Sequence, residues 1–195
     1  MIAYCATGNP GKLREFRLAA GQAGIRVETL PGPADMLACE ETGATFEANA
    51  ILKAEYYGRH AQGLLFADDS GLEVDALGGA PGVYSARFAG PDATDVANNQ
   101  LLLERMRGVR DRAARFVCVI ALVAGGRFQH TFRGEVEGAI LEEPRGPNGF
   151  GYDPLFYYAP FACSFGEAAP ERKLTVSHRG AALRDLFHYL STASV

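Results

Sequence analysis

Residues 64–90 read LLFADDSGLEVDALGGAPGVYSARFAG, and no other part of the sequence is as informative about the fold. Its first four residues are apolar and come directly before the adjacent carboxylates of Asp68 and Asp69. An apolar run that ends in acids is typical of a buried strand delivering side chains to the exposed carboxyl edge of an α/β sheet, where ligands bind. Paired carboxylates repel unless a cation lies beside them, and Mg²⁺ is the simplest such cation. The alternative is an acidic turn that only caps a helix.

The surrounding chain alternates between strand and helix patterns. Strands are expected at residues 2–6, 25–30, 64–67 and 155–158, helices at 10–20, 45–61, 94–107 and 178–190, and a hairpin at 115–124 and 127–137. Gly125-Gly126 predicts the tight turn of that hairpin. The proline- and glycine-rich segment 31–35 is expected to be a loop. This order predicts a mixed α/β sheet flanked by helices, in a single domain over residues 1–195.

Composition excludes several classes of function. The chain has 195 residues, enough for a substantial core, and a net charge of −4, which provides no basic field for nucleic acid. Its four cysteines are scattered without a CxxC pair, which argues against a zinc site or a disulfide framework. We see no basic leader, and the longest apolar run, residues 116–124, is too short to span a bilayer. We therefore expect a cytoplasmic protein with no membrane or nucleic-acid partner.

The first turn, TGNPGK at residues 7–12, could bind phosphate. Asn9 is a good N-cap, and Pro10 suits the first helical position. The glycines allow close approach to free N–H groups at a helix start, and Lys12 adds a cation. The spacing is not that of a Walker A loop, and an ordinary strand-to-helix turn is the alternative.

Other polar residues precede or occupy the predicted helices. Glu40 and Glu41 come just before the second helix and could give further oxygen ligands to a metal at the acids, or only favour the helix dipole. Asn49 and Lys53 are four residues apart and share a helix face. For Lys53 the alternative is a solvated surface position.

Two later segments could contact a ligand. Phe150 and Tyr152 lie in a glycine-rich loop, where aromatic rings can stack on a base, although both could be core residues. His178 and Arg179 fall in the first turn of the last helix, where cations are unfavourable for the dipole. Together with Lys173 they indicate a ligand, or else a surface salt bridge.

Six segments together resemble the inosine/xanthosine triphosphate pyrophosphatase family, also called HAM1-like, and most closely its bacterial members. They are TGNPGK at 7–12, EETGATFEANAILKA at 40–54, DDSGLEVDALGGAPGVYSARFAG at 68–90, TDVANNQLL at 94–102, GFGYDPLF at 149–156 and KLTVSHRGAAL at 173–183. The match runs nearly end to end. It implies an elongated mixed sheet in two lobes with a central cleft, and a homodimer.

The resemblance also implies residue roles. Asp69 would be the catalytic acid/base, with Asp68 and Lys12 beside it, and Asp69 would hold Mg²⁺ together with Glu40 or Glu41. The residues implied to bind substrate are Thr7, Gly8, Asn9, Pro10, Gly11, Lys12, Lys53, Ser70, Phe150, Gly151, Tyr152, Asp153, Lys173, His178 and Arg179.

The implied reaction is hydrolysis of ITP, dITP or XTP to the monophosphate and pyrophosphate. A 6-keto base accepts hydrogen bonds from donors such as Arg179 or His178, and adenine would leave those donors unpaired. The alternatives are a Maf-like pyrophosphatase acting on other nucleotides, and a non-catalytic nucleotide-binding module.

Overall fold

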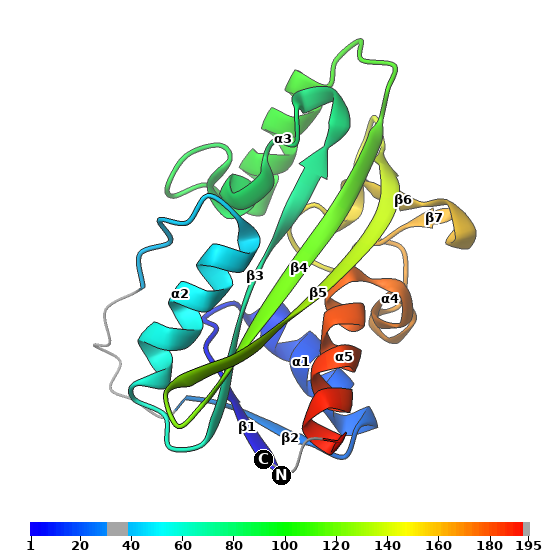
Figure 1. The fold of residues 1–195 in the computed structure, drawn as a ribbon. Helices are drawn as coiled ribbons and strands as arrows, with labels where there is room; N and C mark the ends of the chain where they lie inside the picture. Colours follow the sequence, from blue (N-terminus) through cyan, green and yellow to red (C-terminus); the bar gives the residue numbers. More distant parts are fainter. Residues whose placement is uncertain (31–38, 193–195) are drawn as a thin grey trace. The chain divides into compact units, whose positions relative to one another are not determined.

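The described part of the chain, residues 1–30 and 39–192 of a computed structural model, contains one mixed sheet of seven strands. Hydrogen bonds join the strands in the order β2-β1-β3-β4-β5-β6-β7 (Figure 1). The predicted mixed α/β sheet is confirmed. The segment 31–35, predicted to be a loop, lies outside the described residues. No helix among the described residues is long and apolar enough to cross a membrane.

The strands are β1 (Ile2–Cys5), β2 (Arg26–Thr29), β3 (Leu64–Val74), β4 (Ala113–Ala124), β5 (Arg127–Ile140), β6 (Phe156–Tyr158) and β7 (Cys163–Ser164). The α-helices are α1 (Pro10–Gln22), α2 (Phe46–Gly58), α3 (Asp95–Arg105), α4 (Pro170–Val176) and α5 (His178–Thr192). Short 3₁₀ turns are η1 (Asp75–Leu77), η2 (Gly82–Arg87), η3 (Asp153–Leu155) and η4 (Ala159–Phe161). The predicted strands, hairpin and helices are all present, and α4 is the helix that the pattern did not predict.

The chain divides into two compact units. Unit 1 comprises residues 1–69, 118–134 and 178–195, and unit 2 comprises residues 70–117 and 135–177.

In unit 1, β1 is parallel to both β2 and β3, with Cys5 opposite Phe66 in the register. Helices α1 and α5 pack against each other (Figure 1). The edge of the Phe16 ring from α1 meets Phe66, with ring centroids 5.1 Å apart, and both rings are buried. This contact fixes α1 on the sheet beside the turn that joins it to β1.

Two local predictions in unit 1 are confirmed in detail. The Asn9 side chain caps α1 by accepting hydrogen bonds from the N–H groups of Gly11 (2.8 Å) and Lys12 (3.1 Å), and Pro10 begins the helix. Gly125 and Gly126 connect β4 to β5 with φ angles of 54° and 74°, values that glycine adopts without strain.

Unit 2 has its own hydrophobic core, in which the rings of Phe116, Phe156 and Phe165 pack against one another. Helix α3 contributes the fully buried Leu102 to this core. Tyr152 also belongs to it and donates its hydroxyl to the carbonyl oxygen of Ser85 at 2.8 Å. The core therefore anchors the residues that flank the predicted base-binding loop.

Candidate active site

The two acids lie inside β3 rather than at its end. β3 continues to Val74, and both Asp68 and Asp69 are almost fully buried, so the prediction of a strand ending at residue 67 with exposed acids was wrong. The physical reason is that buried cations neutralise both carboxylates, which allows the strand to continue through them. The paired part of β1, however, ends at Cys5 opposite Phe66. Asp68 and Asp69 therefore still lie beyond the carboxyl end of the neighbouring parallel strand β1.

Asp68 sits among cations from α1 and α5. The Lys12 ammonium is 2.9 Å from its Oδ2, and the Arg179 guanidinium approaches the same oxygen at 3.5 Å. Arg179 is itself only 2% exposed and also pairs with Glu15 at 2.5 Å. Lys12 and Glu15 are three residues apart and share one face of α1. Asp68 therefore belongs to a buried, charge-compensated network.

Asp69 contacts a different helix, α2. Its Oδ1 accepts from the Lys53 ammonium at 2.8 Å, and its Oδ2 accepts from the Asn49 amide at 3.2 Å. The same ammonium is 3.0 Å from Glu41. Asn49 is fully buried, and its Oδ1 accepts from the backbone N–H of Gly43 at 2.7 Å. Asn49 thus connects the segment that carries Glu41 to Asp69.

These surroundings shift the pKa values of Asp68 and Asp69 in opposite directions. Burial would raise the pKa of Asp68, but the charges of Lys12, Arg179 and Lys53 hold that pKa well below its usual range. Burial raises the pKa of Asp69, and Lys53 only partly offsets this effect. Neighbouring groups whose pKa values are pushed apart are the usual sign of divided roles. Asp68 is the fixed anion, and Asp69 is the better proton acceptor.

The donor chemistry around Asp69 suits a hard cation. Two carboxylates, from Glu41 and Asp69, converge on the single cation of Lys53. Among residues 1–30 and 39–192, no three His, Cys, Asp or Glu side chains are grouped closely enough to hold a metal ion. Of the two glutamates considered as ligands, Glu41 lies beside this cluster, whereas the Glu40 side chain is exposed.

The turn at residues 7–12, which was predicted to bind phosphate, is held in place by hydrogen bonds of its own side chains. Thr7 Oγ1 accepts from the Asn9 N–H at 3.2 Å, and the Asn9 side chain caps the helix. A Cβ on Gly8 would meet no atom within 4 Å, so the space beside this residue is open. Pro10 and Gly11 begin α1, which places Lys12 in its first turn.

The predicted base-binding residues of unit 2 form a second cluster. Asp153 Oδ2 accepts from the Phe150 N–H at 2.9 Å and from the Lys173 ammonium at 2.5 Å. The same ammonium lies 5.0 Å from the centre of the Phe150 ring. Tyr152 is a core ring, as described above, whereas Phe150 is half-buried. Phe150 is therefore the ring of this loop that retains an exposed surface. Ser70, also in unit 2, is half-buried in β3 directly after Asp69.

Sequence patterns gave no role to several residues that position these groups. Glu15 and Asn49 hold Arg179 and Asp69 in unit 1. Helical spacing was the available signal, because Glu15 follows Lys12 by three positions and Asn49 precedes Lys53 by four. Lys173 lies on α4, and His178 and Arg179 begin α5, where both are buried.

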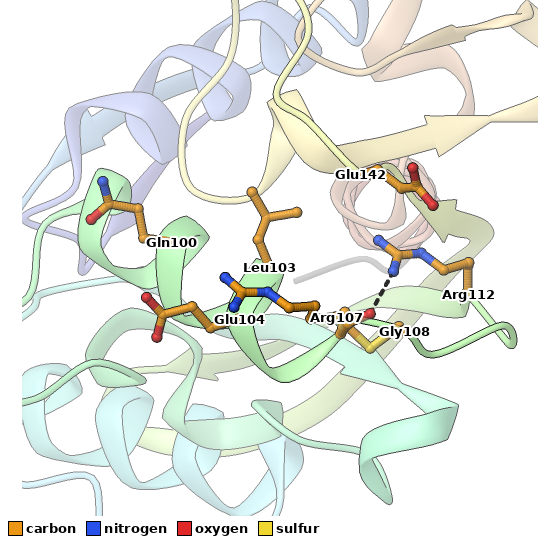
Figure 2. A pocket seen from close by; sticks show the side chains of 8 residues that line it. Gln100, Leu103, Glu104, Arg107, Gly108, Arg112 and Glu142 are labelled. Atoms are coloured by element: carbon orange, nitrogen blue, oxygen red, sulfur yellow. Dashed lines mark hydrogen bonds between the residues drawn. The ribbon is translucent and has the colours of Figure 1, made fainter.

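A separate cavity of about 640 Å³ lies in unit 2 near the end of α3 (Figure 2). None of the predicted site residues lines it. Arg112 is the most prominent cation there, but its guanidinium donates to the carbonyl oxygens of Met106, Ile140 and Leu141. It therefore ties the chain together rather than offering charge to a ligand.

The fold defines an α/β protein, and its buried acid–lysine pairs lie beyond the carboxyl end of β1, the edge at which ligands bind in α/β sheets. Residues 3–189 match the model of the Ham1 family, and the chain belongs to that family. A dITP/XTP pyrophosphatase of Acidobacterium capsulatum is 53% identical over 94% of this chain and 95% of its own. A dITP/XTP pyrophosphatase of Thermus thermophilus is 52% identical, over 95% of this chain and 90% of its own.

Solved structures agree with this assignment. The Staphylococcus aureus Ham1 protein matches with a TM-score of 0.86 and 39% identity, covering 98% of each chain. A nucleoside-triphosphatase described as a dITP/XTP pyrophosphatase, from Mycobacterium abscessus, gives a TM-score of 0.74 and 40% identity over 95% of this chain and 98% of that one. The predicted family and α/β fold are confirmed.

Proposed function

We propose that this chain hydrolyses dITP, ITP and XTP to the nucleoside monophosphate and pyrophosphate. The observation that carries the proposal is the pair Asp68–Asp69, in which each acid contacts a different lysine from a different helix. The curated relatives at about half identity support the same reaction, because they are dITP/XTP pyrophosphatases. This hydrolysis would remove deaminated purine triphosphates from the nucleotide pool.

Asp69 is the general base in this proposal. Its raised pKa makes its carboxylate a stronger proton acceptor than Asp68. Water would attack the α-phosphorus and pass a proton to the Asp69 carboxylate as the β,γ-diphosphate unit leaves. The Asn49 amide and the Lys53 ammonium each hold one oxygen of Asp69, so its orientation is fixed before substrate arrives.

Positive charge for the triphosphate would come from Lys12 and Lys53. Asp68 holds the Lys12 ammonium at 2.9 Å and keeps it near the open space beside Gly8. Mg²⁺ would be held by Asp69 with Glu41 in preference to Glu40, and when bound it supplies charge neutralisation and a more acidic water. The half-buried ring of Phe150 would stack on the base.

Several wider features complete the proposal. The chain would act as a single pyrophosphatase domain over residues 1–195, and the resemblance to the family implies that the enzyme is a homodimer. The scattered cysteines suit a location in the reducing cytoplasm. Donors at His178 and Arg179 would favour a 6-keto purine over adenine, because adenine would leave buried donors unpaired.

The test is hydrolysis of dITP, XTP, dATP, dGTP and dUTP with Mg²⁺ present, with the products separated. The expected products from dITP and XTP are monophosphate and pyrophosphate, formed far faster than from dATP or dGTP. Release of orthophosphate would contradict the reaction. A preference for dUTP would favour the Maf-like alternative, and tight binding of dITP without turnover would favour a binding module.

A further inference from the structure

We propose that Asp95 and Asn99 of α3 are positioning residues that set base selectivity by holding the peptide groups of Gly151. The inference rests on the proposed function, because it assumes that the loop at residues 150–153 faces the base. Neither residue belongs to the predicted catalytic or substrate-binding set. Both act through the backbone of that loop.

The two side chains hold one residue from both sides. Asp95 Oδ2 accepts the N–H of Gly151 at 2.7 Å, and Asn99 Nδ2 donates to the carbonyl oxygen of Gly151 at 3.0 Å. Asp95 and Asn99 are four residues apart, so they lie one above the other on the same face of α3. Together they satisfy the donor and the acceptor of a single loop residue, as a neighbouring strand would.

The contact is specific in its chemistry. Asn99 is 9% exposed, and its Oδ1 has no hydrogen-bond partner among the described residues. The bond to Gly151 therefore orients the Asn99 amide within unit 2. A buried amide with one oxygen unsatisfied costs free energy. Because Asn99 is present despite this cost, we infer that its hydrogen bond to Gly151 contributes more than packing.

The backbone of the loop at residues 150–153 turns at Gly151. Its φ of 60° is in the left-handed region, between Phe150 and the core ring of Tyr152. On the other side of the loop, Asp153 holds the Phe150 N–H at 2.9 Å. Clamping the peptides of Gly151 therefore fixes the direction in which the Phe150 ring is presented. A ring and loop held in one geometry can reject an ill-fitting base, whereas a loose loop adapts to it.

The same helix supplies a matched control. Asn98 is 3% exposed and also makes two backbone contacts, accepting from Ala89 N–H at 2.8 Å and donating to the Ala86 carbonyl oxygen at 3.2 Å. Its partners are Ala86, inside η2, and Ala89, just after η2, and neither belongs to the loop at 150–153. Asn98→Ala therefore removes an equivalent buried amide from α3 without releasing Gly151.

The experiment measures kcat/KM for dITP and for dATP in the wild-type protein and in Asn99→Ala, Asp95→Ala, Asp95→Asn and Asn98→Ala. We expect the ratio of the dITP to the dATP value to fall about tenfold in Asn99→Ala and Asp95→Ala, as for loss of one hydrogen bond that positions the loop. Asp95→Asn keeps an acceptor oxygen and should restore the ratio. Asn98→Ala should keep the wild-type ratio even if it lowers the melting temperature.

An unchanged ratio in Asp95→Ala, whose exposed side chain makes misfolding a poor explanation, would overturn the inference. An equal fall in Asn98→Ala would also overturn it, because the effect would then belong to α3 in general. A wild-type protein that does not prefer dITP would contradict the proposed function itself, and the inference with it.

Discussion

Asp68 and Asp69 are neighbours in the chain but face opposite sides of β3, because successive side chains of a strand alternate. Asp68 meets Lys12 and Arg179, from α1 and α5, whereas Asp69 meets Lys53 from α2. Alternation thus gives two adjacent carboxylates separate cations and opposite pKa shifts. One dipeptide therefore carries a carboxylate with a lowered pKa and a carboxylate with a raised pKa.

At this scale the account predicts that Asp69→Asn lowers kcat by about 10²- to 10⁴-fold, the usual contribution of a general base. The fold should remain intact, because an amide can still accept from Lys53 and the substitution removes a buried charge. Steady-state turnover of dITP, together with circular dichroism, measures both effects.

The matched control is Asp75→Asn, which alters an exposed carboxylate of unit 2 paired with Arg115. It should retain wild-type turnover. Near-wild-type kcat in Asp69→Asn would remove Asp69 from the role of base.

At the scale of elements, the middle of β5 lies directly against the first turns of α5. A Cβ added to Gly134 would overlap the carbonyl oxygen of His178 and lie 2.7 Å from the Ala182 nitrogen. Glycine is needed here because of this close approach, and not because of an unusual φ. This packing fixes the position of the first turn of α5, which carries His178 and Arg179, against β5.

We therefore predict that Gly134→Ala lowers the free energy of unfolding by about 1–3 kcal/mol, as overpacking does. It should also lower turnover by displacing the first turn of α5. Urea denaturation and dITP hydrolysis measure the two effects.

Gly21→Ala is the control for this substitution. Gly21 lies in α1, and an added Cβ would meet nothing within 4 Å. Alanine there should stabilise the protein by about 0.5–1 kcal/mol. Equal stability of the two variants would contradict the close packing of β5 and α5.

Elements with strong local signals could be predicted from the sequence. Asn9 with Pro10 fixed the start of α1, and Gly125-Gly126 fixed the hairpin. The length of β3 could not be predicted, because the cations that neutralise its acids come from distant parts of the chain. Helix α4 was missed because seven residues give too little periodicity.

At the scale of the whole molecule, acid sensitivity follows from the charges around Asp68. Lys12, Arg179 and Lys53 hold the pKa of this acid below the unfolded-state value of 3.8. The Cys118 thiol, 3.9 Å from Asp68, has a pKa raised by burial to about 12 and stays neutral. Since the folded pKa lies below the unfolded one, the stabilisation is present above pH 3.8 and is lost as pH falls towards the folded value.

The prediction is that Asp68→Asn is less stable than wild type near neutral pH and that the difference shrinks as pH falls below 3.8. Asp69→Asn should behave oppositely, because its folded pKa is raised and its charge opposes folding at higher pH. Urea unfolding at several pH values between 6 and about 3 measures these slopes. Parallel stability curves for wild type and Asp68→Asn would contradict the assignment.

The site was only partly predictable at this scale. Motif residues such as Lys12, Lys53, Asp68 and Asp69 were identified from the sequence, and the structure brings them together in unit 1. Asn99 and Gly151, by contrast, are separated by 52 positions, and no local pattern reveals that one holds the other.

The most direct measurement is hydrolysis of dITP in H₂¹⁸O, with both products analysed by mass spectrometry. We predict one ¹⁸O atom in the dIMP and none in the pyrophosphate, because water is proposed to attack the α-phosphorus. Label in the pyrophosphate, or release of orthophosphate, would contradict it.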